Sequence, residues 1–399
     1  MRVLHLITYP VELPRHGGQA RVANIVQTYA RAGIESRTIA VYQPEYYAGD
    51  AVGRYDLAFP PGSPFREQRL PQHLCTDLVT GHFAAEDPEA WATLAERAVA
   101  FRPDVVQLEQ PWLWPFVKRL RAERRLPPFR VVYSSQNIEA PLKARLLAEQ
   151  PAAVASEMVA RIDALEREVA AAADVTFAVT ASDADALVAF GARRVVLAPN
   201  GIAERVVDPV ALRDWRSRLD GRTFALFVGS AYGPNVTGFW EMFSPSLAFL
   251  APDQRVLVVG GISDMIAHAP VCREWPRINE SRLERAGVQS EGSLAALLEL
   301  ASCVVVPITV GGGSNIKTAE AIASGRPVVG TTASFRGYEA TTALPHVYAT
   351  DEPAEFRRLV KAALDDALPP AGPDRPELRR QVLWSETLKA LPAEVGVLQ

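Results

Sequence analysis

A glycine loop between two apolar runs constrains this chain more than any other part of its sequence. Residues 303–307 predict a buried strand, which leads to Gly311, Gly312 and Gly313. Glycine has no Cβ, so the backbone of such a loop can approach a bound group closely. The following pattern predicts a short helix over 315–323 and a second buried strand over 327–330. Together these elements predict a cradle for a ligand.

The polar residues of this segment indicate which ligand it holds. Ser314 can cap the helix, whose first N–H groups and dipole favour an anion such as phosphate. Lys317 stands in the first turn, where a cation is mildly unfavourable unless an anion binds there. Glu320 follows one turn later. The alternative is that Lys317 and Glu320 form an i,i+3 surface pair and that the glycines only make a tight turn.

A sharper alternative is the phosphate loop of nucleotide hydrolases. Gly311 followed by Lys317-Thr318 comes within one residue of the pattern Gly-x-x-x-x-Gly-Lys-Ser/Thr. That pattern needs glycine where this chain has Ile316, and a β-branched side chain does not readily adopt a positive φ. This residue argues against the hydrolase interpretation.

Length and composition narrow the class of protein. A chain of 399 residues, 48% of them hydrophobic, predicts two domains of nearly equal size. A net charge of −4 argues against nucleic-acid binding. Cys75, Cys272 and Cys303 are odd in number and widely spaced, which predicts buried thiols and neither a disulfide framework nor a metal knot. No apolar run suits a signal peptide or a bilayer span, so we expect a cytoplasmic protein.

Apolar runs alternate with helical patterns along both halves, which predicts βαβ units around parallel sheets. We expect α/β architecture with two Rossmann-like, doubly wound domains facing each other across a cleft, and ligands at the carboxyl ends of the strands. The expected strands are 3–8, 37–42, 105–109, 131–134, 175–179, 195–198, 224–228, 255–259, 304–306, 327–330 and 346–348. The expected helices include 19–31, 155–172, 236–249, 293–300, 315–323 and 354–364.

The same pattern suggests the domain boundaries. We expect an N-terminal domain over 1–203, a linker over 204–222, a C-terminal domain over 223–375, and a tail helix over 376–399 that returns to the N-terminal domain. Residues 47–89 are rich in proline, glycine and charge and show weak periodicity. This segment predicts either a substrate-facing loop or an ordinary surface insertion.

The whole chain resembles the family-four glycosyltransferases of the GT-B fold. The best match is residues 311–329, which look like the glycine loop, acidic helix and Gly-x-Pro-Val-Val strand of that family. Weaker matches are Gly17-Gly18, Ala173-Asp174-Val175 with Thr180-Ala181-Ser182, Pro199-Asn200-Gly201, and Phe227-Val228-Gly229-Ser230. The resemblance implies that the C-terminal domain holds a nucleoside diphosphate sugar and that the N-terminal domain presents an acceptor. It also implies a retaining, metal-independent transfer without a cofactor, to a small-molecule, glycan or lipid-linked hydroxyl or amine.

The resemblance assigns roles to residues of the glycine loop and its surroundings. Glu320 would bind the ribose hydroxyls, because a carboxylate can accept two hydrogen bonds from a vicinal diol. Lys317 and backbone N–H groups would stabilise the departing diphosphate. The expected donor-binding residues are Gly17, Gly18, Gly229, Ser230, Asn235, Gly312, Gly313, Ser314, Asn315, Ile316, Lys317 and Glu320.

The chain departs from the family pattern in three ways. Gly312 stands where many members have a first glutamate, eight positions before Glu320. Ser230 and Asn235 stand where many have arginine and lysine, so neutralisation of the diphosphate must use Lys317, helix ends, or one of Arg15, Arg21 and Arg336. Gln136 replaces a common histidine and cannot act as an acid or base.

On the acceptor side, Asn137 and Glu139 follow the apolar run 131–133 and are expected at a strand end. Glu139 is a candidate base or acceptor-positioning residue, or else a turn residue or helix cap. Glu109 also ends a predicted strand and is the third catalytic candidate. His16, beside Gly17-Gly18, is the histidine best placed to take part, unless it is a solvated loop residue.

Residues 112–125 join aromatic side chains to a cluster of cations, a composition typical of an interfacial helix. This segment predicts a peripheral membrane contact, or else a solvated helix with an apolar inner face. Two other functions remain open for the whole chain: a GT-B nucleotide-sugar epimerase, and a catalytically silent relative that binds a nucleotide sugar or serves as a partner subunit.

Overall fold

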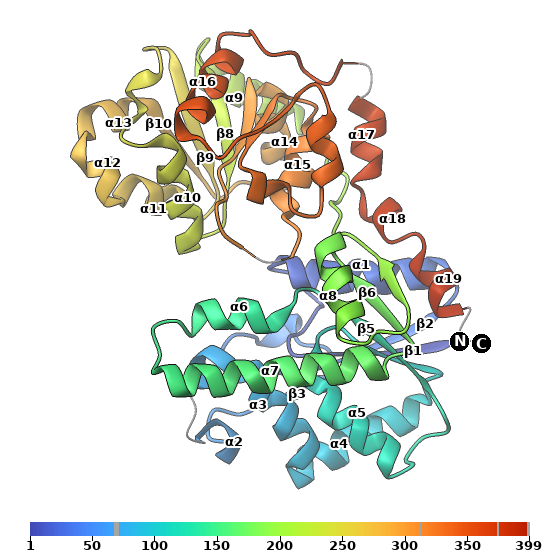
Figure 1. The fold of residues 1–399 in the computed structure, drawn as a ribbon. Helices are drawn as coiled ribbons and strands as arrows, with labels where there is room; N and C mark the ends of the chain where they lie inside the picture. Colours follow the sequence, from blue (N-terminus) through green and yellow to red (C-terminus); the bar gives the residue numbers. More distant parts are fainter. Residues whose placement is uncertain (68–71, 312, 373–374, 397–399) are drawn as a thin grey trace. The chain divides into compact units, whose positions relative to one another are not determined.

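The computed structural model describes the chain except for residues 68–71, 312, 373–374 and 397–399. The chain divides into two compact units (Figure 1). Unit 1 comprises Met1–Pro199 with Thr387–Gln399, and unit 2 comprises Asn200–Glu386. Each unit is built on a parallel sheet covered by helices, so the expected pair of Rossmann-like domains is confirmed.

Unit 1 contains a seven-stranded sheet in the order β3-β2-β1-β4-β5-β6-β7. Its strands are β1 (Arg2–Ile7), β2 (Glu35–Tyr42), β3 (Leu57–Ala58), β4 (Val105–Leu108), β5 (Arg130–Ser134), β6 (Val175–Ala178) and β7 (Val195–Leu197). Its helices are α1 (Gly17–Arg31), α2 (Pro64–Glu67), α3 (Gln72–Glu86), α4 (Pro88–Phe101), α5 (Trp114–Ala122), α6 (Glu139–Leu146), α7 (Ala152–Ala172), α8 (Ala181–Ala189) and α19 (Leu391–Gly396).

Unit 2 contains a six-stranded sheet in the order β10-β9-β8-β11-β12-β13. Its strands are β8 (Thr223–Val228), β9 (Gln254–Val259), β10 (Leu283–Gly287), β11 (Cys303–Val306), β12 (Val328–Gly330) and β13 (Val347–Ala349). Its helices are α9 (Pro209–Leu219), α10 (Gly233–Phe243), α11 (Ser263–His268), α12 (Pro270–Glu274), α13 (Pro276–Arg282), α14 (Glu291–Leu300), α15 (Ile316–Ser324), α16 (Pro353–Leu364) and α17 (Arg375–Gln381). Helix α18 (Trp384–Thr387) spans the unit boundary.

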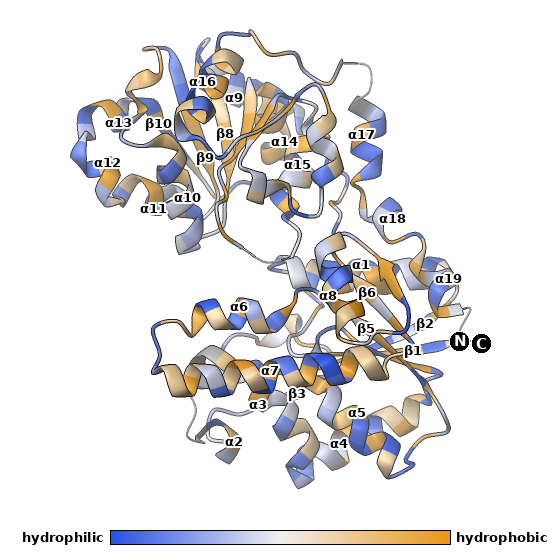
Figure 2. Ribbon diagram, in the orientation of Figure 1, coloured by the Kyte–Doolittle hydropathy of each residue, from blue (hydrophilic) through white to orange (hydrophobic). Residues whose placement is uncertain are grey.

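The central strands are apolar without interruption because both faces of each sheet are buried. In β8, Ala225 and Phe227 pack with α10 and α16, whereas Phe224 and Leu226 pack with α9 and α14. Figure 2 shows this concentration of apolar residues along the strands. Such strands are the easiest elements to predict, and the expected central strands are confirmed to within one or two residues at each end.

The strand order places one switch point in each sheet. The order reverses between β1 and β4 in unit 1 and between β8 and β11 in unit 2. Ligands of doubly wound sheets bind outside the carboxyl ends of the strands at such a point. In unit 2 this edge carries Ser230 and the glycine loop, and in unit 1 it carries Thr8 and Glu109.

Several elements differ from the sequence-based expectations. Residues 47–89 include α3, whose side chains pack against helices on several sides, so no single apolar stripe marks it. The expected helix over 236–249 ends at Phe243, just before Pro245, and a 3₁₀ turn, Leu247–Phe249, follows. Strand β10 carries Glu284 and Arg285 at an edge of the sheet and was not predicted. The segment 204–222 contains α9, and the described part of the expected tail helix, 376–396, forms short helices rather than one.

The segment 112–125 packs its aromatic side chains into the core. Trp112, Trp114 and Phe116 are all almost fully buried in unit 1. Of the cations, Lys118 pairs with Glu168, and Arg119 pairs with Glu123. An apolar face for membrane insertion is therefore not present in this segment, which matches the alternative of a helix with an apolar inner face. No helix in the described ranges has the length and apolarity needed to cross a bilayer.

Helix α10 approaches the end of β11 closely enough to require glycine. A Cβ on Gly238 would lie 2.3 Å from the carbonyl oxygen of Pro307, whereas a Cβ on Gly233, in the same helix, meets nothing within 4 Å. We predict that Gly238→Ala lowers the free energy of unfolding by about 1–3 kcal/mol, because backbone atoms cannot yield as a flexible side chain does. Gly233→Ala should change it by no more than about 0.5 kcal/mol. Urea titration checks both, and equal midpoints would contradict the packing described.

Candidate functional site

The glycine loop leads into α15 with its helix start open. Gly313 adopts a left-handed φ of 59°, which favours glycine. The N-cap residue is Asn315, not Ser314, so the predicted Ser314 cap is wrong. The Asn315 side chain makes no capping hydrogen bond, and within the described residues Ser314 Oγ is buried without a partner. Ile316 is the first helical residue, and Gly312 lies outside the described residues. This helix start retains N–H groups that suit an anion.

Lys317 is held at this helix start by a second element. Its Nζ donates to Asn235 Oδ1 at 3.0 Å, and Asn235 Nδ2 donates to the carbonyl oxygen of Ser230 at 3.1 Å. Burial lowers the pKa of Lys317 to about 8, and Glu320 acts in the opposite direction. The ammonium is thus costly to keep charged without an anion beside it. Ser230 and Asn235, which replace expected cations, instead orient Lys317.

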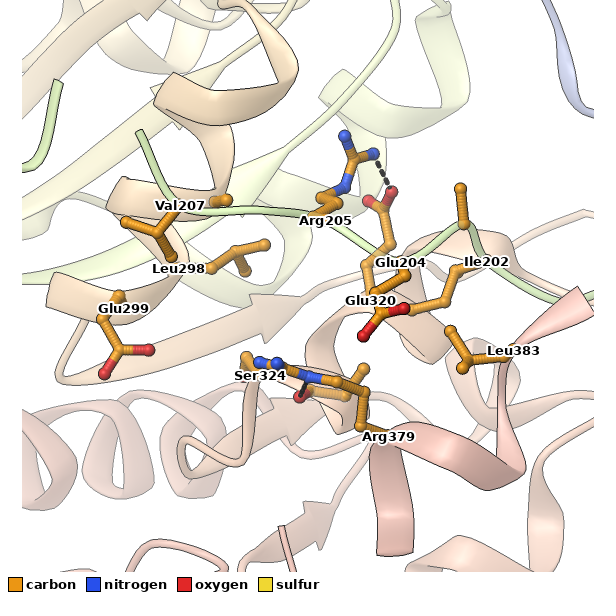
Figure 3. Close-up of a pocket in the computed structure, with 13 residues that line it drawn as sticks. Ile202, Glu204, Arg205, Val207, Leu298, Glu299, Glu320, Ser324, Arg379 and Leu383 are labelled. Atoms are coloured by element: carbon orange, nitrogen blue, oxygen red, sulfur yellow. Dashed lines mark hydrogen bonds and ion pairs between the residues drawn. The ribbon is translucent and has the colours of Figure 1, made fainter. Parts of the chain in front are cut away.

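Glu320 is engaged by a residue that sequence reasoning missed. Arg205 donates to Glu320 Oε1 at 2.5 Å, with both side chains mostly buried. Figure 3 shows the two side chains pointing toward each other in a pocket also lined by Ile202, Leu298 and Ser324. Arg205 also lies 3.9 Å from Glu291. The alternative of a surface pair between Lys317 and Glu320 is wrong, because each side chain bonds a different partner.

The three proposed auxiliary cations lie in different surroundings. Arg336 donates from Nε to the carbonyl oxygen of Gly313 at 2.6 Å and therefore lies against the glycine loop. Arg21 is buried in unit 1, where it donates to the carbonyl oxygen of Ala198 at 2.8 Å. Arg15 is exposed on the loop before α1. Only Arg336 of these three shares unit 2 with Lys317.

Side chains crowd Gly229 in unit 2 and Gly18 in the first helix of unit 1. A Cβ on Gly229 would lie 2.8 Å from Ile262 Cγ2. Gly17 begins α1, and a Cβ on Gly18 would lie 2.4 Å from the Tyr9 hydroxyl. His16 is the N-cap of α1 and accepts from the backbone N–H of Gln19 at 3.4 Å. Burial lowers the pKa of His16, which therefore favours the neutral form.

Glu139 is a buried carboxyl group at the start of α6. Burial raises its pKa to about 8, Lys143 opposes the shift, and Asp77 and Glu166 add to it. Asn137 hydrogen-bonds the Glu139 side chain. Glu166 accepts hydrogen bonds from the backbone N–H groups of Glu139 and Ala140, each at 2.8 Å, and so caps the start of α6. Because its pKa is about 8, Glu139 stays protonated near neutral pH.

Glu109 lies deeper than the other two catalytic candidates. It has no exposed surface, and its Oε1 contacts His5 Nδ1 at 2.6 Å and accepts from Gln107 Nε2 at 2.8 Å. Within the described residues its Oε2 has no hydrogen-bond partner. The geometry favours a role in organising the end of β4 over direct contact with a substrate. Its catalytic assignment, like those of Asn137 and Glu139, stays a prediction.

Cys75, Cys272 and Cys303 are free and buried, as their spacing predicted. Among the described residues, no group of three His, Cys, Asp or Glu side chains is arranged to hold a metal ion.

The buried Glu139 should make stability depend on pH. A carboxyl whose folded-state pKa is raised contributes stability that is complete below its unfolded value of 4.5 and is lost as pH rises toward about 8. We predict that Glu139→Gln removes a slope of up to about 1.4 kcal/mol per pH unit within this window. Urea unfolding at several pH values measures it. Glu157→Gln, an exposed change on α7, should leave the slope unchanged; parallel pH profiles for the wild type and Glu139→Gln would contradict the raised pKa.

Comparisons with known proteins identify the family of both halves of the chain. Residues 16–201 match the family model described as "Glycosyl transferase 4-like domain", and residues 222–366 match "Glycosyl transferases group 1". A search of curated protein sequences finds no match.

Solved structures match the fold over the whole chain at low sequence identity. HepE of Anabaena, in complex with UDP, has a TM-score of 0.69 at 14% identity and covers 100% of both chains. Sucrose-phosphate synthase of Thermosynechococcus elongatus has a TM-score of 0.67 at 15% identity, covering 100% of this chain and 99% of its own. The lipopolysaccharide outer core galactosyltransferase WaaB has a TM-score of 0.64 at 10% identity, with 100% coverage of both chains. At such identities the likeness concerns the fold.

Proposed function

We propose a function from the premise that this chain belongs to the glycosyltransferases, in the family with a 4-like N-terminal domain and a group 1 C-terminal domain. The protein transfers a sugar from a nucleoside diphosphate sugar to an acceptor hydroxyl or amine, with retention of configuration and without a metal. The observation that carries this proposal is the pair of charged residues on α15. Lys317 is a half-buried cation at an open helix start, and Glu320 lies one turn away in a pocket.

These residues suit the bond changes of such a transfer. The bond between the anomeric carbon and the diphosphate oxygen breaks, and its electron pair leaves with the diphosphate. Lys317 and the N–H groups at the start of α15 stabilise that charge. The acceptor oxygen forms the new bond to the anomeric carbon, and its proton passes to the departing diphosphate. Retention requires attack on the face that the diphosphate leaves.

Glu320 provides the contact to the nucleoside. Its carboxylate can accept two hydrogen bonds from the 2′ and 3′ hydroxyls of a ribose, once Arg205 yields or shifts. Related structures contain UDP and UDP-glucose, which supports a uridine nucleotide and a hexosyl group as the first donors to test. Acceptors of small-molecule, glycan and lipid-linked type all belong to the proposal.

Parallel reactions with and without an acceptor distinguish this function from the two alternatives, an epimerase and a catalytically silent relative. UDP-glucose and related sugar nucleotides are incubated with and without a panel of acceptors, and products are followed by mass spectrometry. Transfer only with an acceptor, with the anomeric configuration retained, supports the proposal. Conversion of the donor to an epimer without an acceptor indicates an epimerase. Nucleotide binding without turnover under any condition indicates a silent relative. Activity that survives a chelator supports metal independence.

Peripheral membrane contact through 112–125 is proposed in an electrostatic form only, since the aromatic side chains are buried. Co-sedimentation with anionic vesicles at low ionic strength tests it, because such attraction is screened by salt. Protein that stays in solution contradicts it.

A further inference from the structure

We propose that Asp77, with Gln136 and Glu139, forms an acceptor subsite in unit 1, and that this subsite takes an uncharged, hydroxyl-rich acceptor rather than a phosphorylated one. The inference rests on the proposed glycosyl transfer and adds a substrate class to it. Asp77 lies on α3, within the segment 47–89 for which the sequence left open a substrate-facing role or a surface insertion.

Asp77 reaches the switch point of the sheet in unit 1. Its Oδ2 accepts from Lys143 Nζ at 2.8 Å, and its Oδ1 lies 3.4 Å from Thr8 Oγ1, just beyond the end of β1. The Thr8 hydroxyl has one proton, which it donates to Gln110 Oε1 at the shorter distance of 2.8 Å. Asp77 Oδ1 therefore keeps acceptor capacity, and with a side chain 31% exposed it can be reached by a hydroxyl group.

Gln136 supplies a donor beside the same edge. The Tyr9 hydroxyl donates to Gln136 Oε1 at 2.8 Å. This bond fixes the orientation of the amide, so its Nε2 donor points away from the Tyr9 hydroxyl. Within the residues that the structure describes, this Nε2 is buried and has no hydrogen-bond partner. A buried donor without a partner is unfavourable because it has lost its hydrogen bonds to water, so a ligand oxygen at this position would restore the missing bond. Donor and acceptor together match a hydroxyl group, which can both accept and donate.

The charges around this edge favour an uncharged ligand. The groups facing Glu139 are Lys143 on its own helix, Asp77 from α3 and Glu166 from α7. Lys143 is already paired with Asp77. The charged groups that bear on the Tyr9 hydroxyl are the acidic residues Glu109, Glu139 and Asp77. Asp77 is paired with Lys143 and Glu139 is protonated near neutral pH, so a phosphate would find no unpaired cation among these groups to balance its charge, whereas a neutral polyol needs none.

The test compares neutral and phosphorylated acceptors. Glucose, galactose and mannose are each offered beside their 6-phosphates, with UDP-glucose as donor. The wild type should use at least one neutral sugar more efficiently than its phosphate. Asp77→Asn should raise the KM for that sugar roughly tenfold or more, as loss of a charged hydrogen bond predicts. UDP affinity and the slow hydrolysis of UDP-glucose should stay within about twofold, because the donor edge lies in unit 2.

Two further variants separate positioning from folding. Gln136→Met keeps the charge and volume and should also raise the acceptor KM. Asp163→Asn removes an exposed carboxylate paired with Arg167 and should change nothing. Asp77→Asn should also shift the pH profile of transfer toward lower pH, because Asp77 raises the pKa of Glu139. A merely structural role of Asp77 would not move that profile while donor hydrolysis stays intact.

Three outcomes overturn the proposal. Preference for the sugar phosphates would contradict the uncharged substrate class. An unchanged acceptor KM in Asp77→Asn and Gln136→Met would contradict the assignment of these residues to an acceptor subsite. An equal loss of donor hydrolysis and transfer in Asp77→Asn assigns that residue to structure. Each of these leaves glycosyl transfer intact. Wild-type protein that neither binds UDP nor turns over UDP-glucose instead contradicts the proposed function itself.

Discussion

Replacing Lys317 by methionine should weaken UDP binding roughly 10- to 100-fold and leave uridine binding unchanged, since a charged hydrogen bond to phosphate is worth about 1.5–3 kcal/mol. The reason is geometric: Asn235 holds the Lys317 ammonium at the start of α15, where an anion finds both the cation and free N–H groups. The rate of transfer should fall by more, on the order of 10²–10³-fold, because charge builds on the diphosphate in the transition state. Calorimetry and steady-state rates measure the two effects.

The pH dependence gives this prediction a second readout. Burial lowers the pKa of Lys317 to about 8, and a bound diphosphate favours the ammonium and raises that pKa. UDP affinity should therefore fall as pH rises above about 8, by up to about tenfold per unit. Lys317→Met should remove this dependence. Lys361→Met, which removes a lysine paired with Asp365 on α16, is the matched control. Equal affinity of Lys317→Met and wild type for UDP would show that the cation faces no phosphate.

Replacing Glu320 by glutamine should weaken UDP and uridine alike, roughly 10- to 100-fold, because the lost contact is to the ribose that both share. This pattern differs from that of Lys317→Met, which spares uridine. Competition and direct calorimetric titrations with both ligands distinguish the two. A loss for UDP alone would place Glu320 near the phosphates.

Arg205 provides the matched test of the same carboxylate. Its guanidinium forms an ion pair with the Glu320 carboxylate at 2.5 Å, so ribose binding must displace or rearrange this ion pair. Arg205→Gln should therefore strengthen uridine binding, because binding no longer breaks a mostly buried pair. Weaker binding in Arg205→Gln would show instead that Arg205 contacts the nucleotide directly.

The glycine loop and the central strands could be predicted because their causes are local. Strands such as β11 are buried on both faces and read as unbroken apolar runs, and Gly313 marks a left-handed backbone position. These features were enough to predict the fold class, and the match to the family models agrees with that prediction. Helix α3 was hidden because burial on several sides removes the amphipathic stripe on which prediction depends.

The partners of the candidate site residues could not be predicted, because they come from distant parts of the chain. Arg205 lies 115 positions from Glu320, and Asn235 lies 82 positions from Lys317. Asp77 meets Lys143 across 66 positions. Within the sequence, Lys317 and Glu320 looked like neighbours on one helix face. Only the tertiary structure shows that each is held by a different element, and that Ser230 and Asn235 orient the lysine instead of adding charge.

The most direct test of the account is a calorimetric titration of UDP, GDP, ADP and TDP into the wild-type protein. We expect one nucleotide, with UDP as the first candidate, to bind clearly more tightly than the others and to lose that affinity in Glu320→Ala. A protein that binds none of the four would contradict the assignment of α15 and its glycine loop as the donor site.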